Sequence, residues 1–131
     1  MVEVFAEAPA DPLGDEYLDR LLARNSFWAL AALVGSTVVG GLTAHTLPMT
    51  RSDSSEVFIY DLAVATDHQR QGVGSALVLR LRQAAAAEGV HEVFVAADDE
   101  DAHALDFYRT QGAIGDAVTM FTFAGLSPTG R

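Results

Sequence analysis

A strand-like run, a glycine loop and a long helical pattern follow one another between residues 57 and 88, and this order constrains the fold most. Residues 57–64 form an apolar run with one charge, typical of a central strand. Residues 72–88 repeat apolar side chains on one helical face, and Gly89 can end the helix at its C′ position. The segment therefore predicts the first strand and the helix of a right-handed parallel crossover.

Two further strand-like runs, residues 27–34 and 37–47, flank Gly35-Ser36. A Gly-Ser pair between two such runs predicts an antiparallel hairpin. Residues 11–25 precede the hairpin and carry apolar side chains at helical spacing, which predicts an amphipathic helix. A polar loop over residues 48–55 leads from the hairpin to the central strand.

The last third of the chain predicts three more elements. Residues 91–97 are strand-like, residues 102–111 have a helical pattern that Gly112 can close, and residues 118–123 read as a last strand. Strand, helix, strand and helix after an antiparallel hairpin imply a mixed α/β sheet. No repeat or linker divides the 131 residues, so we expect a single domain over residues 1–131, with about residues 125–131 as a flexible tail.

The composition excludes several kinds of chemistry. The chain has no cysteine, which excludes disulfides, thiolate metal sites and a cysteine acyl-enzyme. It also has no lysine, because all eight basic residues are arginine, and this removes Schiff-base chemistry and the lysine of a P-loop. The four histidines show no zinc-ligand spacing, so no metal site is expected.

The net charge of −10 bears on the partners and the location. Such a charge disfavours nucleic acid and anionic membranes, and it favours a cationic partner. No apolar run reaches the roughly 18 residues of a membrane span, and Met1-Val2-Glu3 does not begin a signal peptide. A cytoplasmic protein is the expectation.

The glycine loop predicts an anion site. Gly72 and Gly74 lie at the start of the long helix, where backbone N–H groups and the helix dipole attract an anion, and neither glycine has a Cβ in the way. Gln69 and Arg70 add donors, so the loop suits a pyrophosphate. The alternative is that the glycines only form a tight loop. The spacing does not match the G-x-G-x-x-G fingerprint of dinucleotide-binding folds.

With Leu62-Ala63-Val64 in front and a helix behind, Gln69-x-x-Gly72-x-Gly74 resembles the Q/R-x-x-G-x-G/A motif of the GNAT superfamily of N-acetyltransferases. The resemblance implies the GNAT fold, in which a central parallel strand pair splays around acetyl-CoA and helices flank the sheet. It implies acetyl-CoA as co-substrate, with the pantetheine arm bonded by the strand backbone and the phosphates by the loop. The residues implied are Leu62, Ala63, Val64, Gln69, Arg70, Gln71, Gly72, Val73, Gly74 and Ser75.

Residues 101–113 resemble a second motif of the family, N-x-x-A-x-x-F/L-Y-x-x-x-G-F. The match implies that the Tyr108 phenol protonates the departing CoA thiolate, as at the matching position in many members. Asp101 stands where the motif has Asn, and Ala113 where it has an aromatic. Without the glycine loop, Tyr108 beside Phe107 would read as core packing.

Most of the chain, from about residue 3 to residue 124, resembles the small aminoglycoside 3-N-acetyltransferases. The similar runs include residues 17–32, 60–64, 69–72 and 93–98. This resemblance implies that the substrate is a gentamicin-type aminoglycoside acetylated on its 3-amino group, and that the activity confers antibiotic resistance.

Acidic residues are the candidates for binding the amine. Asp61 interrupts an apolar strand, where a charge needs a partner or a task, and a matching acidic position lies in the amine pocket of polyamine acetyltransferases of the superfamily. A salt bridge to an arginine is the alternative. Tyr60 precedes it. A second acidic run follows the strand at residues 91–97 and is either a polyamine site or a solvated loop: Asp98, Asp99, Glu100 and Asp101.

The implied mechanism is direct transfer in a ternary complex, because no cysteine is present to carry the acetyl group. Asp61 is the first candidate for binding and deprotonating the ammonium, and Asp98 is the second. Backbone N–H groups near Val64 would polarise the thioester carbonyl. Two rival functions stay open: an acetyltransferase of a polyamine, peptide or other small amine, and a non-catalytic acetyl-CoA-binding module. A small sheet with an open edge also favours a homodimer.

Overall fold

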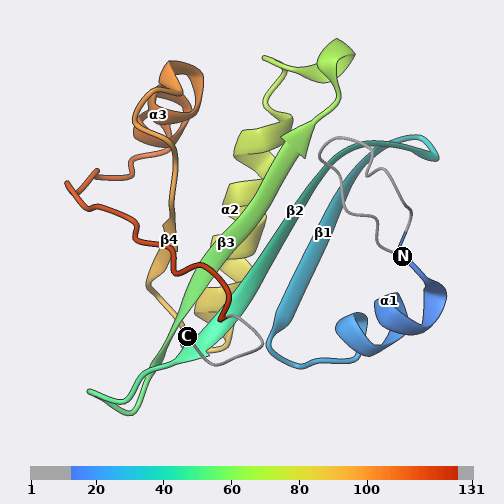
Figure 1. Ribbon diagram of the computed structural model, residues 1–131. Coiled ribbons are helices and arrows are strands. Elements are labelled where there is room, and N and C mark those ends of the chain that lie inside the picture. The colour runs from blue at the N-terminus through green and yellow to red at the C-terminus, as the bar shows by residue number, and fades with distance from the viewer. Residues whose placement is uncertain (1–12, 127–131) are drawn as a thin grey trace. The chain divides into compact units, whose positions relative to one another are not determined.

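The computed structural model describes residues 13–126 (Figure 1). The described residues fall into two compact units, residues 13–96 and residues 97–126. The first unit contains α1 (Asp15–Leu22), β1 (Phe27–Val34), β2 (Thr37–Pro48), β3 (Ser55–Val64), a short 3-10 helix η1 (Thr66–His68), α2 (Val73–Ala87) and β4 (Val93–Val95); the second contains α3 (Ala102–Thr110). The expected single domain includes residues outside 13–126 and stays a prediction.

The sheet has the strand order β1-β2-β3-β4 (Figure 1). β1 and β2 form an antiparallel hairpin, β2 and β3 are also antiparallel, and β3 and β4 are parallel. Gly35 at the hairpin turn has a φ of +63°, which a residue with a side chain rarely adopts. The structure therefore confirms the mixed α/β sheet, the hairpin and the parallel crossover.

Helix α2 covers one face of the sheet, behind the strands in Figure 1. The buried core comprises sheet and α2 residues: Val39, Leu42, Ala44, Val57, Ile59, Leu77, Val78, Leu81 and Ala85. Gly40 brings β2 close to the first turn of α2, because a Cβ there would lie 3.0 Å from Val73 Cγ1 and 3.2 Å from Ala63 O. Helix α1 contacts β1 on the opposite face, where it lies over His45 of β2.

The two later helices end as the glycine positions predict. In α2, Gly89 N donates to Ala86 O and Val90 N donates to Ala85 O, each at 2.9 Å, and Gly89 has a φ of +83°. In α3, Gly112 N and Ala113 N donate to the third- and fifth-preceding carbonyls in the same way. Both ends are Schellman motifs, which satisfy carbonyls that a helix end leaves free.

Three expected elements differ from the structure. The helix expected over residues 11–25 spans Asp15–Leu22, because turn hydrogen bonds from Arg24 N to Leu21 O and from Phe27 N to Arg24 O replace helical ones; residues 11 and 12 lie outside the described part. The strand expected over residues 91–97 is only Val93–Val95, and it pairs with β3 over just those residues.

The prediction of a last strand over residues 118–123 is wrong. Residues 113–126 form neither helix nor strand, and their apolar side chains are exposed, including Val118, Met120, Phe121 and Phe123. A strand is defined by hydrogen bonds to a neighbour, and none of the strands within residues 13–126 pairs with this segment. The expected tail at about residues 125–131 lies mostly outside the described part. None of the helices in residues 13–126 is long and apolar enough to cross a membrane.

Candidate active site

The glycine loop has a backbone shape that suits an anion. Arg70 has a φ of +62° and Gly72 a φ of +84°, so two left-handed residues lie just before α2 with one residue, Gln71, between them. Left-handed residues within a turn aim successive N–H groups into one concavity, a nest that binds anions. Because Arg70 carries a Cβ, its conformation is strained, and such strain is concentrated at functional sites.

The start of α2 adds further donors. Ala76 N donates to Gly72 O at 3.0 Å as the first bond of the helix. The N–H groups of the preceding residues therefore point out of the helix end. No side chain caps Gly72, and the first turn of α2 contains no acidic residue, so the positive end of the helix dipole is not offset locally. A phosphate group fits these donors.

Polar side chains near the loop support the same interpretation. Gln69 Nε2 donates to Val64 O at 3.1 Å, and Gln71 Nε2 donates to Asp67 O at 3.3 Å. The two glutamines thus connect the loop to the end of β3 and to η1. His68 Nδ1 is buried and has no hydrogen-bond partner among the described residues. A buried polar atom without a partner is costly, so His68 is an unusual feature of the segment that leads into the loop.

β3 continues past the point where β4 stops. The parallel pairing joins Val57, Phe58 and Ile59 to β4, whereas β3 runs on to Val64. In the described chain, residues 60–64 therefore have a sheet neighbour only on the β2 side. Alternate backbone N–H and C=O groups of Leu62, Ala63 and Val64 are left to face the other side. This is the parting of the strands that the resemblance implies, and it lies next to the glycine loop.

A β-bulge places Tyr60 and Asp61. In the register of β2 with β3, Thr43 pairs with Asp61 but Ala44 pairs with Ile59, so Tyr60 is the extra residue. Bulges re-aim side chains and are frequent beside active sites. Tyr60 is 66% exposed, and its ring meets the His45 ring edge-on at 5.8 Å. Tyr60 is thus available to a ligand.

Asp61 is half-buried and has a neutral partner. Its Oδ2 accepts a hydrogen bond of 3.1 Å from Thr43 Oγ1, and Thr43 is buried. Within residues 13–126, Asp61 forms no ion pair with an arginine, so the salt-bridge alternative finds no support there. One hydrogen bond leaves a carboxylate most of its accepting capacity, and that capacity is available to an ammonium.

In the second unit, the acidic run holds its own backbone. Asp98 Oδ1 accepts from Glu100 N at 2.8 Å, and Asp101 Oδ1 accepts from Ala104 N at 3.0 Å. Asp101 is the N-cap of α3, a role that Asn fills equally well, and this explains why Asp can replace the Asn of the family motif. The four acidic residues are all exposed, which is compatible both with a cation site and with a solvated loop.

Tyr108 lies on α3, where its ring meets that of Phe107 edge-on at 5.1 Å. Burial raises the pKa of the phenol above its ordinary value, and the negative charge of Asp101 raises it further. The phenol therefore stays protonated at any working pH, which a proton donor requires. The edge-on contact with Phe107 also packs the Tyr108 ring against its neighbour on α3.

The structure gathers the loop, the open part of β3, Tyr60 and Asp61 in the first unit, whereas Tyr108 and residues 98–101 belong to the second. One cluster escaped the sequence analysis: Arg20 of α1 and Arg24, two residues past the end of α1, line a cavity together with His45 of β2. Arg20 and Arg24 are four residues apart in the sequence, a spacing that could have indicated a pair of neighbouring positive charges. Their meeting with His45 depends on how α1 lies on the sheet, which the sequence pattern does not contain.

Comparisons with known proteins agree with this geometry. The sequence matches the acetyltransferase (GNAT) family over residues 2–113. The structure is similar to the aminoglycoside acetyltransferase meta-AAC0020, from an uncultured soil metagenomic sample, in complex with sisomicin: the identity is 37% and the TM-score 0.84, over 92% of this chain and 80% of that one. The aminoglycoside acetyltransferase HMB0005, also from an uncultured soil metagenomic sample, is 37% identical with a TM-score of 0.81, over 88% and 77%.

A more distant structure shares only the fold. AAC(6')-Iy, solved in complex with the bisubstrate analog CoA-S-monomethyl-acetylneamine, is 17% identical with a TM-score of 0.77, over 89% of this chain and 83% of that one. A comparison with curated protein sequences gives no significant match. The four-stranded mixed sheet with its helices thus matches solved structures of the GNAT fold.

Proposed function

We propose that this chain, which belongs to the acetyltransferase (GNAT) family and uses acetyl-CoA as its acyl donor, acetylates an amine of an aminoglycoside antibiotic, and specifically the 3-amino group. The observation that carries the proposal is the 37% identity, over 92% of the chain, to an aminoglycoside acetyltransferase solved with sisomicin. The net charge of −10 supports it, because aminoglycosides are polycations.

The first unit holds acetyl-CoA in this proposal. The backbone of Leu62, Ala63 and Val64 binds the pantetheine arm along the part of β3 that has no β4 neighbour. The nest before α2 and the N–H groups of its first turn bind the phosphates, with Gln69, Arg70, Gln71, Gly72, Val73, Gly74 and Ser75 forming this segment. Acetyl-CoA supplies an activated acyl group as a thioester.

Asp61 binds the acceptor ammonium and takes its proton, and Tyr60 contacts the sugar beside it. An ammonium has no lone pair, so the amine must be neutral before it attacks the thioester carbonyl. Asp61 has a hydrogen bond from Thr43 that orients it and no ion pair in the described chain. Asp98 is the second candidate for the base, and residues 98–101 contribute negative charge that attracts the polycation.

Tyr108 donates to the sulfur of the departing thiolate. The raised pKa keeps the phenol protonated before the thiolate forms. A thiol has an ordinary pKa of about 8.5, below that of a phenol, so the thiolate is the weaker base. The phenol therefore stabilises the thiolate chiefly by a strong hydrogen bond, with the proton shared along it. Acetylation removes one positive charge from the antibiotic, and this loss of charge is the proposed basis of resistance.

A substrate panel tests the proposal. Release of CoA thiol is measured with gentamicin, sisomicin, kanamycin, spermidine and a peptide amine, and NMR of the product assigns the acetylated nitrogen. We expect gentamicin and sisomicin to have the highest kcat/KM and the product to be acetylated on the 3-amino group. Spermidine or the peptide exceeding them tenfold would overturn the substrate class. Acetylation at another nitrogen would overturn only the regiochemistry, and binding of acetyl-CoA without thiol release would indicate a non-catalytic module.

A further inference from the structure

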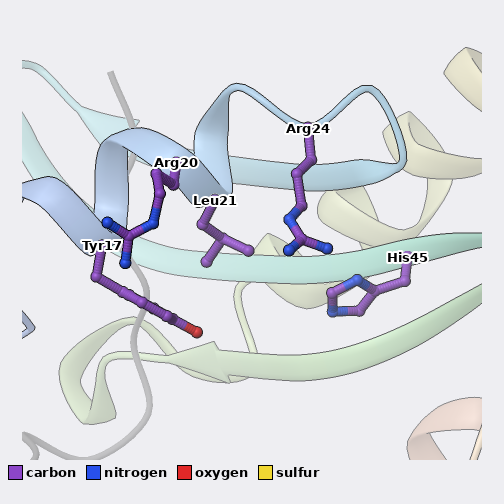
Figure 2. Close-up of a pocket in the computed structure, with 5 residues that line it drawn as sticks. All are labelled: Tyr17, Arg20, Leu21, Arg24 and His45. Carbon is purple, nitrogen blue, oxygen red and sulfur yellow. The ribbon is translucent and has the colours of Figure 1, made fainter.

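A cavity of about 240 Å³ lies between α1 and β2, on the sheet face opposite α2, and it carries positive charge. It is lined by Tyr17, Arg20, Leu21, Arg24 and His45 (Figure 2). Figure 2 shows the Arg24 guanidinium pointing from the loop after α1 toward the His45 ring on β2. The Tyr17 hydroxyl points into the space under the helix in the same view. Four polar side chains thus line the cavity together with the apolar side chain of Leu21.

The cavity is separate from the glycine loop. Gly40, which faces the first turn of α2, and His45 are five residues apart on β2, a distance of about 16 Å along an extended strand. Ala44 is fully buried in the core that α2 covers, and side chains alternate along a strand, so the neighbouring His45 faces away from α2. Phosphates bound at the start of α2 therefore do not reach this cavity.

The arginines in the cavity lack protein partners. Among residues 13–126, neither Arg20 nor Arg24 forms an ion pair, although the chain has 18 acidic residues. With 3.6 residues per turn, Asp15 and Asp19 lie on the opposite side of α1, and Glu16 lies at the edge of the cavity face without pairing to Arg20. Arg20 on the last turn of α1 and Arg24 just after the helix carry like charges that repel each other, and an anion bound in the cavity would offset that repulsion.

The donors and the volume define the ligand. Guanidinium groups bind carboxylates and phosphates through paired N–H groups, and a tyrosine hydroxyl adds one more donor. Cavities that hold drug-sized ligands measure roughly 300–1,000 Å³, so this one accepts a smaller group. We propose that the cavity under α1 is a binding site for a single oxyanion, a phosphate or a carboxylate group, separate from the acetyl-CoA site.

Calorimetry on the full chain tests the proposal. Inorganic phosphate is titrated at constant ionic strength into protein saturated with CoA, so that the phosphate site of the glycine loop is already filled. We expect saturable binding that Arg20→Gln with Arg24→Gln weakens at least about tenfold, because charge-assisted hydrogen bonds are lost. The matched control is Arg80→Gln with Arg82→Gln, which removes two exposed charges from α2 and should change the dissociation constant less than about twofold.

A second variant and a second probe complete the experiment. Arg24→Lys keeps the positive charge but loses the paired N–H groups of the guanidinium, so it should also weaken phosphate binding. Succinate in place of phosphate distinguishes a carboxylate ligand from a phosphate ligand, and saturable binding of either, lost in the double variant, supports the site. The proposal would be overturned if neither probe bound saturably, or if the Arg20/Arg24 and the Arg80/Arg82 double variants lost the same amount of affinity. The acceptor is absent throughout, so the result does not depend on the proposed function.

Discussion

The glycine loop and the acidic run of residues 98–101 offer a ligand different kinds of groups. In the loop the donors are backbone N–H groups, aimed by left-handed residues and by the start of α2. In the acidic run, Asp98 and Asp101 already accept hydrogen bonds from nearby backbone N–H groups. A substitution in the loop acts through backbone shape and steric access, whereas one in the run changes charge and local structure together. Backbone sites can therefore be read from glycine positions, but the role of a carboxylate depends on its partners.

The largest effect should come from blocking the loop. Gly74→Leu puts a branched side chain at the second residue of α2, where the phosphates approach. We expect the dissociation constant of CoA to rise roughly 100-fold, because about two charge-assisted hydrogen bonds are lost. Calorimetry measures it. Gly115→Leu is the matched control, since a Cβ at Gly115 meets nothing within 4 Å, and it should leave CoA affinity unchanged. Equal affinities in the two variants would remove the phosphates from the loop.

Tyr108→Phe should affect turnover and not binding. We expect kcat to fall roughly 10²-fold while the dissociation constant of CoA stays the same, because only the hydroxyl is removed. The pH profile adds a second check. A phenol with a raised pKa remains a donor as pH rises to about 10 and is lost above that, so wild-type kcat should not decline through this group below pH 10. Full turnover in the variant would assign Tyr108 to packing.

The smallest effect should come from the acidic run. Asp101→Ala removes the cap of α3 and should lower the free energy of unfolding by about 1 kcal/mol. Asp101→Asn keeps the cap and should lower the free energy of unfolding by only a few tenths of that amount. Chemical denaturation measures both. Asp99, which forms no hydrogen bond within residues 13–126, serves as the control through Asp99→Asn. If Asp101→Asn lowers kcat/KM for sisomicin far more than Asp99→Asn does, Asp101 has a role beyond the cap.

Local signals predicted much of the first unit. Gly35 marked the hairpin turn, Gly89 marked the end of α2, and the order of the elements indicated the parallel strand pair; in the second unit, Gly112 marked the end of α3. Each of these depends on the backbone conformation of one or two residues. The sequence analysis therefore found the loop and the elements that position it.

Features that depend on pairing between distant residues were missed. The bulge at Tyr60 and the Thr43–Asp61 hydrogen bond follow from the register of β2 with β3, which no local pattern encodes. A last strand was expected over residues 118–123, but a strand also requires a partner, and these residues have none in the described chain. The cationic cavity under α1 was missed for the same reason, since it joins α1 to β2.

The central claim is that Asp61 serves the acceptor amine, and one variant tests it directly. Asp61→Asn keeps an oxygen that can accept from Thr43 but loses charge and basicity. Both kcat/KM and Tm are measured for this variant. We expect kcat/KM for sisomicin to fall at least about 100-fold, because the charge and the base are lost. Tm should fall by less than about 4 °C, since no arginine is left unpaired among the described residues. Normal kcat/KM with a large drop in Tm, as the loss of a buried ion pair worth roughly 3–5 kcal/mol produces, would contradict the account.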